Sequence, residues 1–252
     1  MGGLRCLPLP MGKVSLFQKI IDATKLAAVV IDPQHRGSIL EITNEPDDAA
    51  KDSGAADVII KAEEKWRGYN TLWRAAVSAL EDALRSKSKA EKPLEGRVVM
   101  IVGVNALART MAYGIKNRGG VPIIASRDGG AAQMAAQQFQ CRHVQFEAIY
   151  STMHDILVVC SEEKEKLREK ARSGEIGVHG SYLKPGMGVM DLTAMPRTTR
   201  LLEDAEVRGC VTVSPKLVLL GQLELQVRLL TGKDVPRELL EGVLAQTDRT
   251  EA

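Results

Sequence analysis

Short apolar runs alternate with longer amphipathic stretches through the second half of the chain. The run Val98–Val102 is continuous, as expected for a strand that is covered on both faces. Residues 106–116 have a helical pattern that ends at the pair Gly119 and Gly120, which is typical of a helix C-terminus. The same alternation predicts a helix at 129–139 and further strands at 121–125, 143–146, 156–160, 188–192 and 211–213. Strands separated by helical stretches indicate right-handed crossovers and a parallel sheet.

The first 85 residues have a similar but less regular pattern. It predicts strands at 27–31 and 57–61, and helices at 13–25, 39–43 and 72–84. The charged segment 85–93, closed by a proline, separates this part from the first strand of the second half. A last, apolar helix is expected at 217–230, with Gly232 as its stop. The fold class is therefore α/β: a small N-terminal α/β domain (1–85), completed by helices in about 215–252, and a Rossmann-type doubly wound parallel sheet at 94–214.

Composition narrows the classes of function. Of the 252 residues 44% are apolar but only 4% are aromatic, so the core is aliphatic. Basic and acidic residues number 34 and 32, which argues against a nucleic-acid surface, and no apolar run approaches the ~18 residues of a membrane span. The four cysteines are scattered, with no spacing of metal ligands, and the N-terminus lacks the features of a signal peptide. We expect a soluble cytoplasmic protein with no metal, no nucleic-acid partner and no membrane partner.

A glycine turn follows the first strand of the second half and opens a predicted helix. It contains Gly103, Asn105 and Ala108 in the pattern G-x-N-x-x-A. In this context a Gly-rich turn holds a pyrophosphate on helix N–H groups, but Asn105 stands where a second glycine lets the phosphate approach. Two interpretations stay open: a turn that needs one glycine, or a dinucleotide site of reduced fit. In the second interpretation the cofactor-binding residues are Gly103, Asn105, Ala106, Ala108 and Arg109.

The next strand ends at Ser126, Arg127 and Asp128, where a Rossmann unit selects the ribose of its cofactor. Arginine suits the 2′-phosphate of NADP, whereas an acidic residue favours the free 2′-hydroxyl of NAD. Arg127 is the better-placed partner, although Asp128 beside it repels phosphate. We therefore predict NADP, with Ser126 and Arg127 as further cofactor-binding residues, and leave open NAD and a solvated loop arginine.

Several weak motifs occur in the order of one known family. Lys65–Thr71 is similar to K-x-x-G-x-N-T-D, and Gly54–Val58 is similar to G-A-V-N-T. Gly103–Arg109 resembles G-A-G-G-A-A-R, and Asp191–Pro196 resembles D-x-V-Y-x-P. The segment Val213–Gly232, with Gln222 inside it, resembles a final S-G-x-x-M-x-x-x-Q…T-G helix. Together these segments resemble shikimate dehydrogenase, particularly the form fused to 3-dehydroquinate dehydratase.

The resemblance implies NADP-dependent interconversion of 3-dehydroshikimate and shikimate, a step of aromatic amino acid biosynthesis. It implies that residues 1–85 and the C-terminal helices form the substrate domain. It also implies that Asp57, Asn70, Thr71 and Gln222 contact the substrate. From the residues alone, Asn70 and Thr71 are equally explained as turn and helix-capping residues, and Gln222 as a satisfied buried polar group.

The departures from the family pattern concern the positions that the resemblance assigns to catalysis and substrate binding. Arg36 stands in place of the family's catalytic lysine, Leu72 in place of its aspartate, and Asp57 in place of its asparagine. The first strand, which carries the S-x-S motif for the substrate carboxylate, has no counterpart, so the substrate domain is expected to be truncated. Arginine stabilises an oxyanion but is a poor proton donor, and leucine does not handle protons. His35, beside Arg36, is either a substitute donor or a surface histidine.

Three functions follow from these observations. The first is an NADP-dependent shikimate or quinate dehydrogenase in which Arg36 is the catalytic residue. The second is a catalytically degenerate relative that acts as a ligand-binding or regulatory module. The third, which Trp66–Thr71 and Gln222 fit less well, is a methylene-tetrahydrofolate dehydrogenase of the same build. The partner is left open between a second copy of the chain and a dehydroquinate dehydratase.

Overall fold

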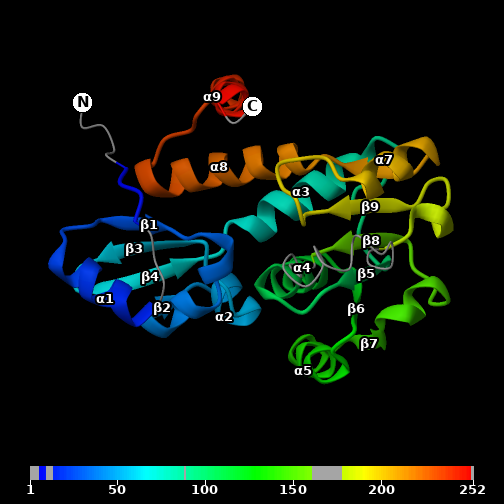
Figure 1. The fold of residues 1–252 in the computed structure, drawn as a ribbon, viewed down its shortest axis with the longest axis horizontal. Coiled ribbons are helices and arrows are strands. Elements are labelled where there is room, and N and C mark those ends of the chain that lie inside the picture. Colours follow the sequence, from blue (N-terminus) through cyan, green and yellow to red (C-terminus); the bar gives the residue numbers. More distant parts are fainter. Residues whose placement is uncertain (1–5, 10–13, 88, 161–177, 251–252) are drawn as a thin grey trace.

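The computed structural model describes residues 6–9, 14–87, 89–160 and 178–250. Two sheets lie at opposite ends of the molecule, the smaller one formed by the first 70 residues and the larger one by residues 98–213 (Figure 1). Two helices that run beside each other, α3 (Leu72–Arg85) and α8 (Pro215–Thr231), extend from one sheet to the other.

The larger sheet is fully parallel, with the strand order β10-β9-β8-β5-β6-β7. This is the doubly wound order, and its switch point lies between β5 and β8. Helices α4 (Ala106–Asn117), α5 (Gly129–Phe139) and α7 (Arg200–Val207) lie in crossovers between its strands. The strands are β5 (Val98–Val102), β6 (Val121–Ser126), β7 (Arg142–Gln145), β8 (Ile156–Val159), β9 (Gly188–Asp191) and β10 (Val211–Val213).

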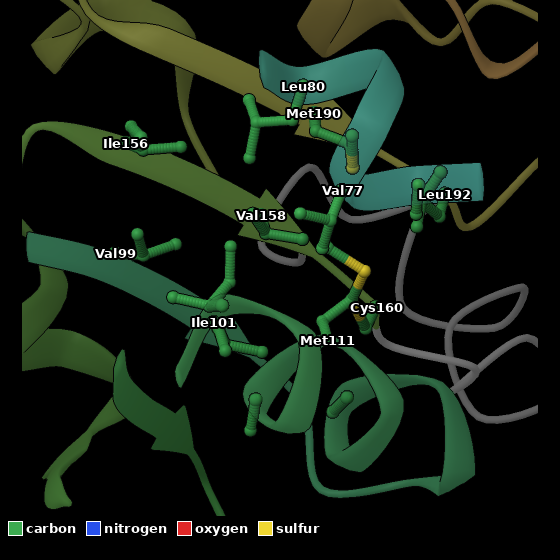
Figure 2. Close-up of a cluster of buried hydrophobic side chains, with 14 of the residues drawn as sticks. Val77, Leu80, Val99, Ile101, Met111, Ile156, Val158, Cys160, Met190 and Leu192 are labelled. Atoms are coloured by element: carbon green, nitrogen blue, oxygen red, sulfur yellow. The ribbon is translucent and has the colours of Figure 1, made fainter. Parts of the chain in front are cut away.

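One face of the larger sheet packs against α3 and α4 through aliphatic side chains (Figure 2). Val99, Ile101 and Val158 project from the strands toward Val77 and Leu80 of α3 and Met111 of α4, and all of them are fully buried. Cys160 belongs to the same cluster, as a buried apolar side chain. The other face is covered by a second cluster that includes Phe146, Leu183 and Leu202.

The smaller sheet has the strand order β1-β3-β4-β2. Strands β1 (Ala28–Val30), β3 (Val58–Ala62) and β4 (Lys65–Tyr69) are antiparallel neighbours, and β2 (Glu45–Pro46) runs parallel to β4. Helix α1 (Val14–Ala23) packs beside this sheet through Phe17 and Ile21, and α2 (Asp48–Ser53) lies at its end nearer α4. The last helix, α9 (Arg237–Thr250), follows α8.

Most predicted elements of the larger sheet are confirmed to within one or two residues, as is the α/β class. Strand 143–146 is displaced by one residue to 142–145, and the short helix at 39–43 is a 3₁₀ turn at 38–42. The patterns missed β2, β4, α2 and α7, whereas α9 lies within the range 215–252 in which C-terminal helices were predicted. The sequence also predicts that the charge run 162–170 is the solvated face of a helix, and these residues lie outside the described part. None of the described helices is long and apolar enough to cross a membrane.

Candidate functional site

Asp57 is the centre of a buried polar group where the smaller sheet meets α3 and α8. Its carboxylate accepts hydrogen bonds from the backbone N–H of Thr71 (2.9 and 3.0 Å) and of Leu72 (2.8 Å). The Thr71 hydroxyl donates to it (3.0 and 3.1 Å), and so does Nε2 of Gln222 on α8 (3.0 Å). Asp57 therefore caps the first turn of α3 and joins α3 to α8, and it brings together three of the four predicted substrate residues.

Two opposing influences act on the Asp57 carboxyl. Burial raises its pKa, because a charged carboxylate loses solvation. The hydrogen bonds from Thr71 and Leu72 lower the pKa, and so does the positive charge of Arg36. Burial is the larger cause, so the net pKa of Asp57 is raised.

Arg36 lies beside Asp57 because its loop is paired with the start of β3. The Arg36 carbonyl accepts a hydrogen bond from Ala56 N (2.9 Å), one residue before Asp57. His35 is half-buried, and its Nε2 is buried with no hydrogen-bond partner among the described residues. The loop thus places the Arg36 cation near a buried carboxylate, with the imidazole of His35 at the next position in the sequence.

Asn70, the fourth predicted substrate residue, bonds in a different direction. Its Nδ2 donates to the hydroxyls of Ser53 (2.9 Å) and Thr110 (3.0 Å), and both Ser53 and Thr110 are buried. Ser53 ends α2 and Thr110 lies on α4, so Asn70 ties the smaller sheet to a helix of the larger one. The sequence gives no signal for this role, because the two partners are 17 and 40 residues away.

Arg109 makes a second connection between the two parts. Its guanidinium donates to the carbonyls of Ser53 (3.1 Å), Gly54 (3.4 Å) and Val104 (3.1 Å). Burial lowers the pKa of Arg109. A Cβ at Gly37 would lie 3.5 Å from Arg109 Nη2, so the loop of Arg36 lies against this side chain. Arg109 was predicted to bind a cofactor; in the structure its donors face backbone carbonyls of the protein.

The glycine turn lies at the switch point of the larger sheet. Gly103 has φ 121°, a conformation that favours glycine, and its N–H donates to Ala125 O (2.9 Å). Asn105 caps α4 by accepting from Ala108 N (2.9 Å), and its Nδ2 donates to Cys160 O (2.5 Å) at the end of β8. The Asn105 side chain therefore spans the switch point from β5 to β8.

Arg127 follows β6 at its carboxyl end, as predicted. Its guanidinium lies 4.0 Å above the ring of Phe146, and Nε is 3.8 Å from a Glu147 carboxylate oxygen. Ser126 accepts from Asp128 N (3.1 Å), and Asp128 caps α5 through Ala131 N (2.9 Å). Asp128 is thus engaged by its own helix, and Arg127 is the cation at this strand end. No group of metal-ligating side chains occurs among the described residues.

Comparison with curated sequences gives relatives of one kind, although no family model matches. The chain is 28% identical over 222 residues to the chloroplastic bifunctional 3-dehydroquinate dehydratase/shikimate dehydrogenase of Arabidopsis thaliana, which covers 84% of this chain. The chain spans only 36% of the length of that relative. It is 26% identical over 206 residues to a shikimate dehydrogenase (NADP(+)) of Syntrophobacter fumaroxidans, covering 80% of this chain and 68% of the relative.

Solved structures agree in fold. A shikimate 5-dehydrogenase from Listeria monocytogenes, in complex with shikimate and NAD, superposes with a TM-score of 0.76 at 20% identity, covering 94% of this chain and 84% of that one. The shikimate dehydrogenase of Aquifex aeolicus gives 0.75 at 20% identity, with 91% and 81% covered.

The fold and site therefore define a two-part α/β protein in which α3 and α8 join a doubly wound parallel sheet to a smaller mixed sheet. The chain is a homologue of shikimate dehydrogenases, as the resemblance predicted.

Proposed function

We propose that the chain is a shikimate dehydrogenase-like oxidoreductase that interconverts 3-dehydroshikimate and shikimate with NADP. The observation that carries the proposal is the contact of Arg109 with the loop of Arg36. It puts the turn at the switch point next to the polar group around Asp57. A nucleotide at the switch point and a small polyhydroxy acid beside Arg36 would then be neighbours. The activities for which the relatives are named support this assignment.

On the substrate side the chain offers the positively charged guanidinium of Arg36 and the imidazole of His35. Arg36 remains protonated, so it stabilises negative charge on the carbonyl oxygen that is reduced. The Asp57 carboxylate accepts hydrogen bonds from Thr71, Leu72 and Gln222. It therefore positions these residues and does not exchange protons with a substrate. Of the described groups around Arg36, His35 is the one suited to hand a proton to the new alkoxide, because an imidazole both donates and accepts protons.

On the cofactor side the residues fit NADP, with fewer free donors than a glycine turn provides. Arg127 stacks on Phe146 and leaves the edge of its guanidinium for a 2′-phosphate, because its ion pair with Glu147 is long and exposed. The turn of Gly103 and the first N–H groups of α4 would hold the pyrophosphate. Asn105 already uses the N–H of Ala108. NADPH supplies the hydride for carbonyl reduction when it is bound.

Positions 57 and 72 explain why we expect slow turnover. The family resemblance puts asparagine and aspartate at these positions, and this chain has aspartate and leucine. Leu72 N donates to the Asp57 carboxylate, so an aspartate at 72 would add a second carboxylate to the same buried region, and burying two negative charges there is unfavourable. Restoring the family's aspartate at 72 thus requires a neutral residue at 57.

The test compares the natural chain with the triple variant Arg36→Lys/Asp57→Asn/Leu72→Asp. NADPH formation from shikimate and NADP is expected to rise in the triple variant by roughly 10²–10⁴-fold, the usual contribution of general acid–base catalysis. The matched control is Arg67→Lys/Asp57→Asn/Leu72→Asp, in which the lysine is introduced at an exposed position of β4 instead of at position 36. This control is expected to stay slow. The natural chain should bind NADP and shikimate, with Trp73 beside Leu72 as the fluorescent reporter. Failure of the natural chain to bind both ligands would reject the proposal.

A ligand-binding role without turnover is the second candidate, and Leu72 is the observation that favours it. Its side chain is 1% exposed and belongs to the main apolar cluster, so it contributes to the core rather than to proton transfer. Binding of both ligands by the natural chain, with no detectable turnover, would select this role.

We further propose a reducing compartment such as the cytoplasm. The four cysteines, Cys6, Cys141, Cys160 and Cys210, form no disulfide with one another. Sedimentation of the chain alone, and with a dehydroquinate dehydratase, distinguishes the two partners left open by the sequence.

A further inference from the structure

A cavity lies at the edge of the larger sheet opposite the switch point. Its volume is about 880 Å³, within the range of small-molecule sites. Its lining includes Val98 at the start of β5, Asp155 just before β8 and Met187 just before β9. These are the amino ends of the strands, whereas the glycine turn and Arg127 follow carboxyl ends. The cavity is therefore separate from the proposed NADP site.

One part of the lining is aromatic, in a chain that has few aromatic residues. Two of the four tyrosines and one of the four histidines line it. Tyr150 and Tyr182 are in edge-to-face contact, with ring centroids 5.1 Å apart, and His154 lies 5.8 Å from Tyr182. Tyr150 is 41% exposed and Met153 is 91% exposed. Such a wall offers rings and a thioether to a flat ligand.

The aromatic wall is uncharged. His154 Nδ1 lies 2.7 Å from the carbonyl of Thr152, which only accepts, so Nδ1 carries the proton. Nε2 then accepts from the Tyr182 hydroxyl at 3.3 Å. Burial lowers the pKa of His154 and strongly raises that of Tyr182, so both side chains are neutral at pH 7.

Two cations also line the cavity. Arg97 and Lys184 have no carboxylate within ion-pair distance in the part of the chain that the structure describes. The acidic residue of the lining, Asp155, accepts a hydrogen bond from Val98 N (2.8 Å). The cavity thus combines a neutral aromatic wall with two cations that have no charged partner there.

We propose that this cavity binds a planar aromatic carboxylate, with its ring against Tyr150, His154 and Tyr182 and its carboxylate on Arg97 and Lys184. The ring contacts favour a flat π-system, and the two cations favour an anion. The proposal does not depend on the dehydrogenase function, because it uses none of the residues near Arg36 or Asn105.

The test is calorimetric titration of the full chain with benzoate as the probe. Cyclohexanecarboxylate has the same charge without the aromatic ring, and it is expected to bind about fivefold more weakly. Benzyl alcohol has the ring without the charge and is expected to bind about tenfold more weakly. Equal affinity for all three compounds would contradict the assigned contacts.

Substitutions of the two cations that line the cavity test whether benzoate binds there. Arg97→Gln and Lys184→Gln are each expected to raise the benzoate Kd about tenfold, as loss of a charge-assisted bond does. Arg118→Gln removes an exposed arginine outside this cavity and should leave the Kd unchanged. A thermal melt of each variant checks folding. The proposal is overturned if benzoate does not bind, if Arg118→Gln weakens binding as much as Arg97→Gln, or if NADP or shikimate displaces benzoate.

Discussion

The side chain at position 57 is hydrogen-bonded to the backbone at position 72. The Asp57 carboxylate takes the N–H of Leu72, and with Thr71 and Gln222 it receives bonds from three residues. An acid at this point is tolerated because every neighbour donates to it and Arg36 is close. A single-residue comparison with the family pattern treats positions 57 and 72 as unrelated, whereas the structure joins them through the bond from the Leu72 N–H to the Asp57 carboxylate.

The first prediction concerns this residue. Asp57→Ala leaves the N–H groups of Thr71 and Leu72 and the Gln222 amide without a buried acceptor, and it is expected to lower the free energy of unfolding by about 2–4 kcal/mol. Asp57→Asn keeps an acceptor for α3, and Gln222 satisfies the new amide by turning its own oxygen toward it. Urea unfolding measures both variants, and equal losses would show that the capping bonds contribute little.

The pH dependence of stability, compared between the natural chain and Asp57→Asn, tests whether the pKa of Asp57 is raised. The folded-state pKa of Asp57 is raised, so its proton stabilises the fold below the unfolded pKa, and this stabilisation is lost as the pH rises through the folded pKa. Asp57→Asn does not titrate. Asp57→Asn should therefore gain stability relative to the natural chain as the pH rises above the ordinary pKa of aspartate, and a constant difference would count against a raised pKa.

At the scale of whole elements, the apolar pattern predicted the larger sheet well because its strands are covered on both faces. The smaller sheet was harder. Residues 65–69 alternate between exposed and buried positions, which is the pattern of a half-buried strand, but they contain a glycine and two basic residues. Helices α2 and α7 are only 6 and 8 residues long, too short for a clear helical period.

Helix α4 carries a further prediction. Asn105→Gly removes the side chain that spans from α4 to Cys160 O and frees the N–H of Ala108 for a ligand. Glycine is an acceptable N-cap, so the cost to the helix is expected to be only a few tenths of a kcal/mol. NADP should bind more tightly, in a fluorescence titration, to this variant than to the natural chain.

Asn117→Gly supplies the control, because Asn117 is exposed at the other end of α4. It should leave NADP affinity unchanged. The same affinity in Asn105→Gly and the natural chain would favour the interpretation that the turn needs only one glycine.

At the scale of the molecule, the candidate site depends on contacts that no local pattern encodes. The predicted residues Asp57, Thr71 and Gln222 do meet, although they come from distant parts of the sequence. The bonds that join the two parts were not predicted, because Ser53, Thr110 and Arg109 acquire their partners only when α2 lies against α4. The family resemblance supplied the site residues, and the structure supplied their mutual contacts.

Arg109→Met tests this junction. The substitution keeps much of the side chain's length but leaves the carbonyls of Ser53 and Gly54 without their donor, and it should lower the free energy of unfolding by about 1–3 kcal/mol. Arg118→Met, at the exposed end of the same helix, should have little effect. Equal stability of the two variants in urea would show that the Arg109 bonds do not hold the parts together.

The end of α2 has a consequence for motion. Three successive carbonyls there, those of Asp52, Ser53 and Gly54, are taken by side chains of α4 and α5, namely Arg109 and Gln138. Once the two parts separate, water can reach these carbonyls and take over the hydrogen bonds, whereas the packed surface of α3 on α8 has no equivalent substitute. If the two parts of the molecule separate to admit a ligand, the hydrogen bonds at the end of α2 should therefore break first. The α3–α8 pair should then act as the hinge.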